Sequence, residues 1–86
     1  MIADKDIYDV LARIFSDVFL RDDIAVAPGL TARDVEGWDS FKQIEIVMAV
    51  EEHFAMKFTS AELDNLRSLG DLARIVAARG HSPQGA

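Results

Sequence analysis

The sequence predicts an all-α protein: a small four-helix bundle of three longer helices plus one short helix, with a long loop between the first two. Three observations lead to this fold class. Apolar residues recur at helical spacing near the N-terminus, helix-start signals follow at three further positions, and no stretch of useful length alternates as a strand does. The 86 residues suit one domain. We expect it to span residues 1–80, with a disordered tail at residues 81–86.

The first helix is expected over residues near 3–19, because one face is apolar and the opposite face is charged. Its apolar residues recur at intervals of three and four: Ile7, Val10, Leu11, Ile14 and Val18. Residues 20–39 contain Pro28-Gly29 and Gly37 and follow no helical or strand period, which indicates a long loop. Apolar residues should pin this loop onto the core: Ile24, Val26, Leu30, Val35 and Trp38. Long loops in compact domains tend to be functional.

The second helix is expected over about residues 40–54. Asp39 and Ser40 are both good N-cap residues, and Ser40 with Gln43 matches a capping box. Similar boxes mark the two later helices, with these pairs: Thr59 with Glu62, and Ser68 with Asp71. The first pair opens a short helix over about residues 60–66. The second opens a last helix that Gly80 ends and in which three residues should face inward: Leu72, Ile75 and Val76.

Charge and composition exclude several classes of function. The net charge is −6, and between residues 34 and 52 six acids face one base, Lys42. The acids are Asp34, Glu36, Asp39, Glu45, Glu51 and Glu52. Such a patch disfavours nucleic acid and anionic membranes and favours partners with basic surfaces, although it also serves solubility alone. The chain has no cysteine, no signal-peptide core at its start and no apolar run near the roughly 20 residues that span a bilayer. We expect a cytoplasmic monomer.

The second helix carries two apolar stripes where a small bundle usually needs one. Val47, Val50 and Phe54 form the expected core stripe, with Gln43 among them. A second stripe, rimmed by carboxylates of Glu45, Glu51 and Glu52, consists of Phe41, Ile44 and Met48. It suggests a docking surface for partners. The alternative is that Phe41 and Ile44 lie at the edge of the core; Met48 is the one that we most expect to be exposed.

Ser40 lies where the long loop meets the second helix. Unpaired amides and the helix dipole favour negative charge there, so a phosphodiester on this serine would be stabilised. Spacing alone still favours an ordinary capping role for Ser40.

The sequence Gly37-Trp38-Asp39-Ser40-Phe41, with the apolar and acidic run from Ile44 to Glu52 and Phe54, closely resembles the signature of acyl carrier proteins. The resemblance continues through Leu63 and the Leu69–Leu72 start of the last helix, to about residue 79.

The resemblance implies that Ser40 receives 4′-phosphopantetheine from coenzyme A, through a separate phosphopantetheinyl transferase (holo-ACP synthase) that uses magnesium. The thiol of this arm would carry an acyl group as a thioester. Asp39 matches the aspartate that precedes the serine. The recognition helix would present Glu45, Met48, Glu51 and Glu52 to acyl-transferring, acyl-activating or condensing enzymes of fatty acid, polyketide or related biosynthesis. A pliable core could shelter the acyl chain, with these residues: Val47, Val50, Phe54 and Ile75.

Departures from the family pattern favour a specialised carrier over a housekeeping one. Phe41 replaces the usual leucine, Gly37-Trp38 precedes Asp39, and Lys42 adds a cation that weakens the negative field beside Ser40.

Other readings stay open. An unmodified helical adaptor would share this sequence pattern, and a peptidyl or D-alanyl carrier would take an aminoacyl group. Catalysis by Ser40 itself is disfavoured because His53 lies about 20 Å along the same helix and His81 lies in the tail. No metal site is expected.

Overall fold

The computed structural model describes residues 3–80 and contains helices joined by loops, with no strand in that range. The helices are α1 (Asp4–Phe19), the single 3₁₀ turn η1 (Ala32–Asp34), α2 (Ser40–Phe54), α3 (Ser60–Asp64) and α4 (Leu69–Arg79). The predicted all-α bundle, with three longer helices and one short one, is confirmed. The predicted domain starts at residue 1, and both residues 1–2 and the tail at 81–86 lie outside the described residues.

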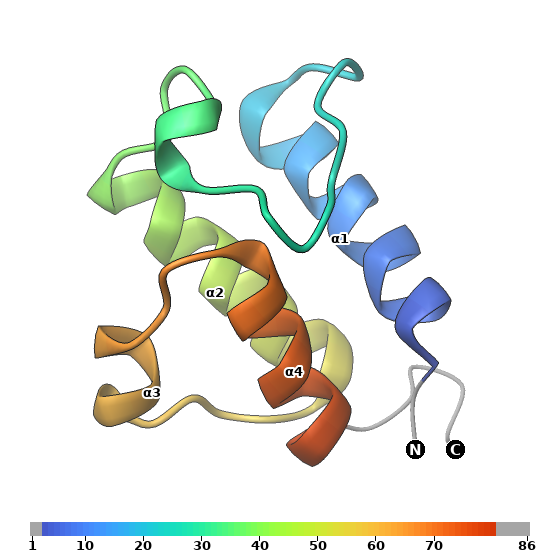
Figure 1. The fold of residues 1–86 in the computed structure, drawn as a ribbon, viewed down its shortest axis with the longest axis vertical. Helices are drawn as coiled ribbons and strands as arrows, with labels where there is room; N and C mark the ends of the chain where they lie inside the picture. The colour runs from blue at the N-terminus through green and yellow to red at the C-terminus, as the bar shows by residue number, and fades with distance from the viewer. Residues whose placement is uncertain (1–2, 81–86) are drawn as a thin grey trace.

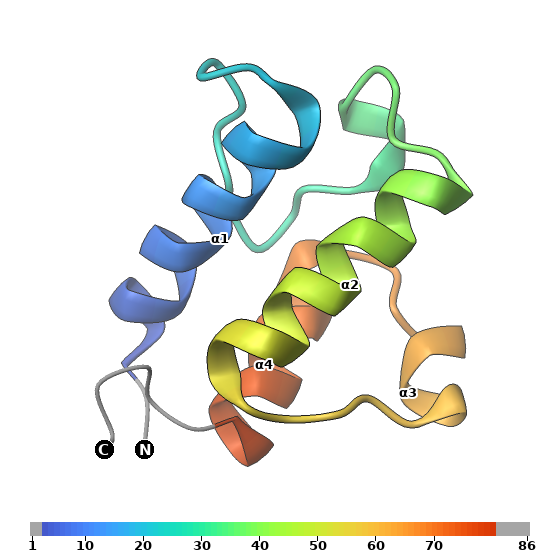
Figure 2. The same cartoon turned by 180° about the vertical axis from the view of Figure 1, so that it is seen from behind.

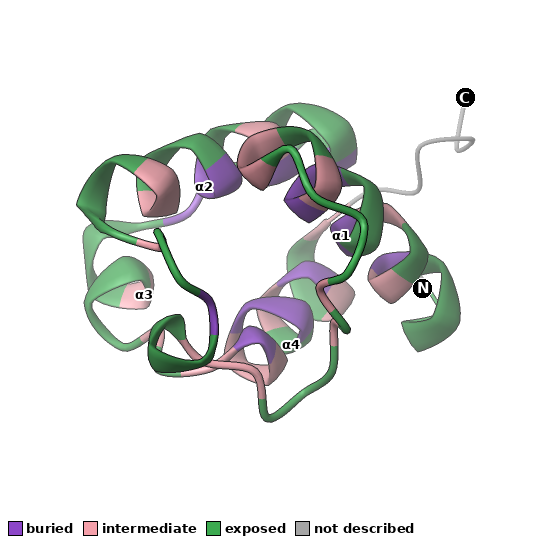
Figure 3. Cartoon of the chain, turned by 90° about the horizontal axis from the view of Figure 1, so that it is seen from above, coloured by how far each residue is buried: buried purple, intermediate pink, exposed green. Residues whose placement is uncertain are grey.

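α1 packs against both α2 and α4, and it runs in the opposite direction to both of them (Figures 1 and 2). The buried faces of these three helices are turned toward one another (Figure 3). α3 lies apart from α1, at the side where the chain returns from α2 to α4 (Figures 1 and 2). The arrangement therefore has one core between three helices and a short fourth helix at its margin.

The core confirms most of the predicted apolar face of α1, since Ile7, Leu11 and Ile14 are buried and Val10 and Val18 are half-buried. Several core residues were not among those predicted, and all of them are at most 8% exposed: Phe15, Ile46, Met56, Phe58, Leu69 and Ala73. In α4, Leu72 and Val76 are buried as predicted, whereas Ile75 is only half-buried.

The long loop follows the prediction in being pinned by its apolar residues, all of which pack on the core or are buried. It is less irregular than expected, because η1 interrupts it. Asp34 Oδ2 accepts from both Thr31 N, at 3.0 Å, and Thr31 Oγ1, at 3.1 Å, so these two side chains close the turn. The sequence signal was present, a threonine followed three residues later by an acid.

The loop is also held by the first amides of α4. Leu69 N donates to Leu30 O at 2.8 Å, and Gly70 N donates to Pro28 O at 2.9 Å. A Cβ on Gly70 would come within 2.9 Å of that Pro28 oxygen, so this close crossing requires glycine. These contacts hold the middle of the loop against the start of α4.

α3 ends two residues before its predicted end. Asn65 leaves the helical backbone at φ −99° and ψ 3°, and its N–H is shared between the carbonyls of Glu62 and Leu63. The capping box at its start is confirmed: Thr59 N donates to Glu62 Oε1 at 2.8 Å, and Glu62 N donates to Thr59 Oγ1 at 3.1 Å.

Candidate functional site

Asp39, not Ser40, caps α2. The Asp39 backbone is extended, and its Oδ1 accepts from Lys42 N at 3.0 Å. Ser40 is the first residue of the helix, is exposed, and has no hydrogen-bond partner for its hydroxyl among residues 3–80. The predicted capping box of Ser40 with Gln43 is wrong, because Asp39 occupies the cap position and the Gln43 side chain bonds elsewhere. The Ser40 hydroxyl is therefore exposed and is not used as the cap of α2.

The turn before Asp39 is held by Trp38. The Trp38 ring packs edge-on against Phe15, with ring centroids 5.1 Å apart, and lies 6.2 Å from the Phe19 ring. Its Nε1 donates to Gln43 Oε1 at 2.8 Å. Gly37 precedes it at φ +90°, a left-handed conformation that favours glycine. Trp38 is half-buried, which agrees with the expectation that it packs against the protein.

An open groove of about 830 Å³ begins at Ser40. α2 forms one wall, and α3 with the start of α4 forms the other. Its lining is mainly apolar and includes Ile44, Val47, Met48, Leu63, Leu66, Leu69 and Leu72. Of the four residues expected to shelter an acyl chain, Val47 lines this groove, whereas Val50 and Phe54 are fully buried in the core. Ile75 lies in a shallow depression between α3 and α4 instead.

The second apolar stripe of α2 is exposed. The exposed fractions are 78% for Phe41, 56% for Ile44 and 61% for Met48. Phe41 and Ile44 are therefore not edge residues of the core. Whether partners bind this stripe stays a prediction, but the surface that such binding requires is present.

The three acids predicted to flank the stripe differ in their surroundings. Glu52 is exposed. Glu45 Oε2 lies 3.5 Å from Lys42 Nζ, which also donates to Val18 O, at the end of α1, at 3.2 Å. The cation expected beside Ser40 is thus held against the negative end of the α1 dipole and against Glu45.

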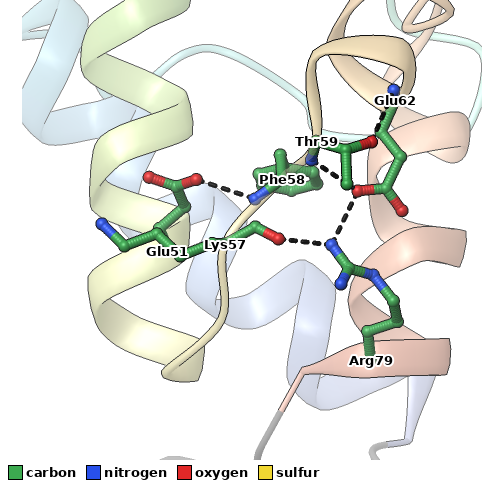
Figure 4. Close-up of polar contacts among 6 residues, drawn as sticks. All are labelled: Glu51, Lys57, Phe58, Thr59, Glu62 and Arg79. Atoms are coloured by element: carbon green, nitrogen blue, oxygen red, sulfur yellow. Dashed lines mark hydrogen bonds and ion pairs between the residues drawn. The ribbon is translucent and has the colours of Figure 1, made fainter.

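Glu51 has a structural contact that the sequence did not reveal. Its Oε2 accepts from Phe58 N at 2.8 Å, across the connection between α2 and α3 (Figure 4). On the other side of this connection, the Arg79 guanidinium donates to Lys57 O and lies 2.6 Å from Glu62 Oε1 (Figure 4). We call these three side chains, Glu51, Glu62 and Arg79, the connection clamp. The clamp holds the segment that leads into α3 and so helps to form one wall of the groove.

Among the described residues, no histidine lies near Ser40. His53 is exposed near the far end of α2, next to Phe54, and His81 lies outside the described residues. Residues 3–80 contain no group of three or more His, Asp or Glu side chains placed to hold a metal ion. No helix in the same range is long and apolar enough to cross a membrane.

These residues fit a phosphopantetheine group. Asp39 side-chain and main-chain oxygens accept from the amides of Lys42 and Gln43, at 3.0 and 2.9 Å, and the amides of Ser40 and Phe41 have no partner among residues 3–80. A phosphodiester on Ser40 would meet the positive end of the α2 dipole. The arm could extend along the groove.

The small helical bundle presents an exposed serine at the start of α2, beside an apolar groove, which is the arrangement expected of a carrier domain modified on a serine. The sequence comparisons specify the family. Residues 9–76 match the family described as "Phosphopantetheine attachment site", and the chain belongs to this family. The predicted resemblance and the predicted cofactor, 4′-phosphopantetheine, are confirmed at this level.

Two known proteins are similar to the chain. The solution structure of holo acyl carrier protein from Geobacter metallireducens matches with a TM-score of 0.77 and 36% identity, covering 81% of this chain and 80% of that one. A Schizosaccharomyces pombe protein named as a mitochondrial acyl carrier protein is 35% identical over 52 residues, which are 60% of this chain. The match spans 46% of that relative's length, so less than half of it is represented here.

Proposed function

We propose that this chain carries acyl groups as thioesters on a 4′-phosphopantetheine arm attached to Ser40, and presents them to biosynthetic enzymes. The observation that carries the proposal is the division of roles at the start of α2. Asp39 caps the helix, which leaves the Ser40 hydroxyl exposed and without a partner among the described residues. When bound, the arm supplies a thiol that forms the thioester.

The protein's own residues hold and present the arm. Ser40 Oγ forms the phosphodiester, and the unpaired amides at the start of α2 stabilise its negative charge. No histidine among the described residues lies near Ser40, and the neighbouring Asp39 carboxylate is bonded to Lys42 N, so we assign the base that takes the Ser40 proton to the transferase. On this proposal the chain is a substrate of its partner enzymes and not an enzyme itself.

We assign the docking of these partners to the exposed stripe and its acids. A partner with a basic surface around an apolar pocket would cover Phe41, Ile44 and Met48 and pair with Glu45, Glu51 and Glu52. The phosphopantetheinyl transferase and the acyl-transferring, acyl-activating or condensing enzymes are partners of this kind. The specialised role and the cytoplasmic location expected from the sequence stay predictions.

The experiment is modification followed by intact-mass measurement. The protein is incubated with coenzyme A, magnesium and a broad-specificity phosphopantetheinyl transferase. Ser60 provides a matched control, because it is also exposed and also follows the N-cap residue of its helix. Wild type and Ser60→Ala should each gain one phosphopantetheine, and Ser40→Ala should gain none.

Two results would contradict the proposal. Modification of Ser40→Ala would place the arm elsewhere. No mass gain in wild type, together with a biological role unaffected by Ser40→Ala, would indicate the unmodified adaptor. Aminoacyl cargo would instead leave the attachment intact and change only the group found on the thiol.

A further inference from the structure

Gln43 is a polar residue with an unusual position. It is half-buried and lies among the apolar residues that line the groove, on the same side of α2 as Val47. Its side-chain oxygen accepts from Trp38 Nε1 at 2.8 Å. An indole nitrogen can only donate, so the partner atom on Gln43 must be the amide oxygen. The direction of the amide group is therefore determined by chemistry.

Trp38 has little freedom to release this bond. Its ring is packed against Phe15, which is fully buried, and lies close to Phe19. The indole N–H is thus held in one direction, toward the Gln43 side-chain oxygen. This hydrogen bond orients the Gln43 amide so that its NH₂ group faces away from Trp38. No residue between 3 and 80 accepts from this NH₂ group. Gln43 therefore presents two donors with no acceptor in the described part of the chain.

These donors are close to the attachment point. Gln43 is three residues after Ser40 in the same helix, a spacing that puts the two Cβ atoms about 5–6 Å apart. Both residues line the groove at the same end. The first acceptors beyond Ser40 Oγ in a phosphopantetheine arm are the anionic oxygens of the phosphodiester. They are within the reach of a glutamine side chain, and a charged acceptor strengthens such a hydrogen bond.

We propose that Gln43 is a positioning residue for the prosthetic group: its side-chain NH₂, oriented by Trp38, donates to a phosphodiester oxygen on Ser40. This inference rests on the proposed function. The hydrogen bond holds the start of the arm on the groove side of α2 and away from Phe41, which does not line the groove. The arm is then directed toward the wall formed by α3 and α4.

The primary test needs no substitution. Side-chain amide ¹H–¹⁵N resonances and the ³¹P resonance are recorded for wild-type apo and holo protein, after intact mass has confirmed loading. We expect the Gln43 NH₂ resonances to move on loading, and the Trp38 indole resonance to stay at its apo position. Unchanged Gln43 NH₂ resonances in a fully loaded sample would overturn the inference and leave the proposed function standing. Failure to load would instead count against the proposed function.

Two variants separate the donor from the hydrogen bond that orients it. Gln43→Glu keeps an acceptor for Trp38 Nε1 but has no NH₂, so its indole resonance should stay near the wild-type position while the holo ³¹P resonance moves. Trp38→Phe keeps a ring on Phe15 but frees the amide, so the loading-dependent shift at Gln43 should shrink. An identical ³¹P resonance in wild type and Gln43→Glu, or a full Gln43 shift in Trp38→Phe, would overturn the assignment.

Discussion

At the scale of single residues, the start of α2 assigns different roles to two neighbouring side chains. The Asp39 backbone is extended, and its carboxylate accepts a hydrogen bond from the amide of Lys42, three residues ahead. Ser40 already has helical geometry, so its hydroxyl is not in the cap position and stays exposed. A serine that also had to cap the helix could not be modified without weakening the helix. Because the aspartate caps the helix, the modification that we propose for Ser40 would leave the cap intact.

We predict that Asp39→Ala destabilises the protein by about 1 kcal/mol, because the amide of Lys42 loses its acceptor at the helix start. Asp39→Asn keeps an oxygen in the same place and should retain most of the stability. Urea unfolding of unmodified protein, followed by far-ultraviolet circular dichroism, measures both. Equal stability of wild type and Asp39→Ala would show that the cap contributes nothing.

At the scale of helices, α3 depends on contacts outside itself. It has five residues, too few for a helix that is stable alone. Its capping box and the connection clamp provide the stabilising contacts that so short a helix lacks by itself. Because Leu63 and Leu66 line the groove, the contacts that hold α3 also determine how open the groove is. Arg79, near the end of α4, thereby takes part in shaping a site that starts at the other end of α2.

Two substitutions of Glu51 distinguish its role in the connection clamp from its proposed role in partner docking. Glu51→Gln removes the charge but keeps an oxygen that can accept from Phe58 N, whereas Glu51→Ala removes both. We predict that hydrogen exchange at the Phe58 amide becomes faster in Glu51→Ala and stays close to wild type in Glu51→Gln. NMR measures the exchange rate of the Phe58 amide directly in both variants. Unchanged Phe58 exchange in Glu51→Ala would mean that the bond does not hold the connection closed.

At the scale of the whole molecule, the acidic surface contains carboxylates with distinct roles. The hydrogen bond from Thr59 N lowers the pKa of Glu62 below its ordinary value of 4.5, with the positive charge of Arg79 adding to this effect. Hydrogen bonds from the amides of Arg67 and Ser68 lower the pKa of Asp71 below 3.8, and Arg74 assists. Both acids lie in the first turn of a helix, so their ionised forms stabilise α3 and α4.

This gives a prediction for the dependence of stability on pH. In the folded protein, Glu62 and Asp71 hold their protons less tightly than in the unfolded chain. Their contribution to stability is therefore complete at pH values above their ordinary pKa values of 4.5 and 3.8, and it is lost as the pH falls through the lowered pKa values of the folded protein. We compare the stability of the wild type with that of the double variant Glu62→Gln/Asp71→Asn. The double variant keeps the oxygen acceptors but cannot ionise at these two positions. Wild type should be the more stable at neutral pH, and this advantage should decrease between about pH 5 and about pH 3.

Urea unfolding of both proteins across this range measures the difference. Charges elsewhere on the molecule affect the two proteins alike and cancel in the comparison. An advantage of wild type that stays constant over the range would show that the two carboxylates do not stabilise the fold through their charge.

Much of the fold could be predicted because its signals are local. The spacing of Ile7, Leu11 and Ile14 and the box of Thr59 with Glu62 involve residues only a few positions apart, and helical geometry converts such spacing into a face or a cap. The burial of Phe58 and Met56 could not be predicted in this way, because they lie in a connection whose path depends on Glu51 and Arg79. The role of Gln43 was hidden for a similar reason. A polar residue on a core stripe signals that some partner exists, but only the tertiary structure identifies it as Trp38.

The sequence alone determined the class of the protein and the position of its serine, because helix periods, caps and the motif around Ser40 are written in neighbouring residues. The tertiary structure decided which residue caps α2, which apolar residues stay exposed, where the groove runs and where Lys42 and Arg79 place their charges. Each of these depends on which distant segments meet, for example Lys42 with Val18 or Arg79 with Lys57. Such pairings follow from the packing of the whole core around α1, α2 and α4.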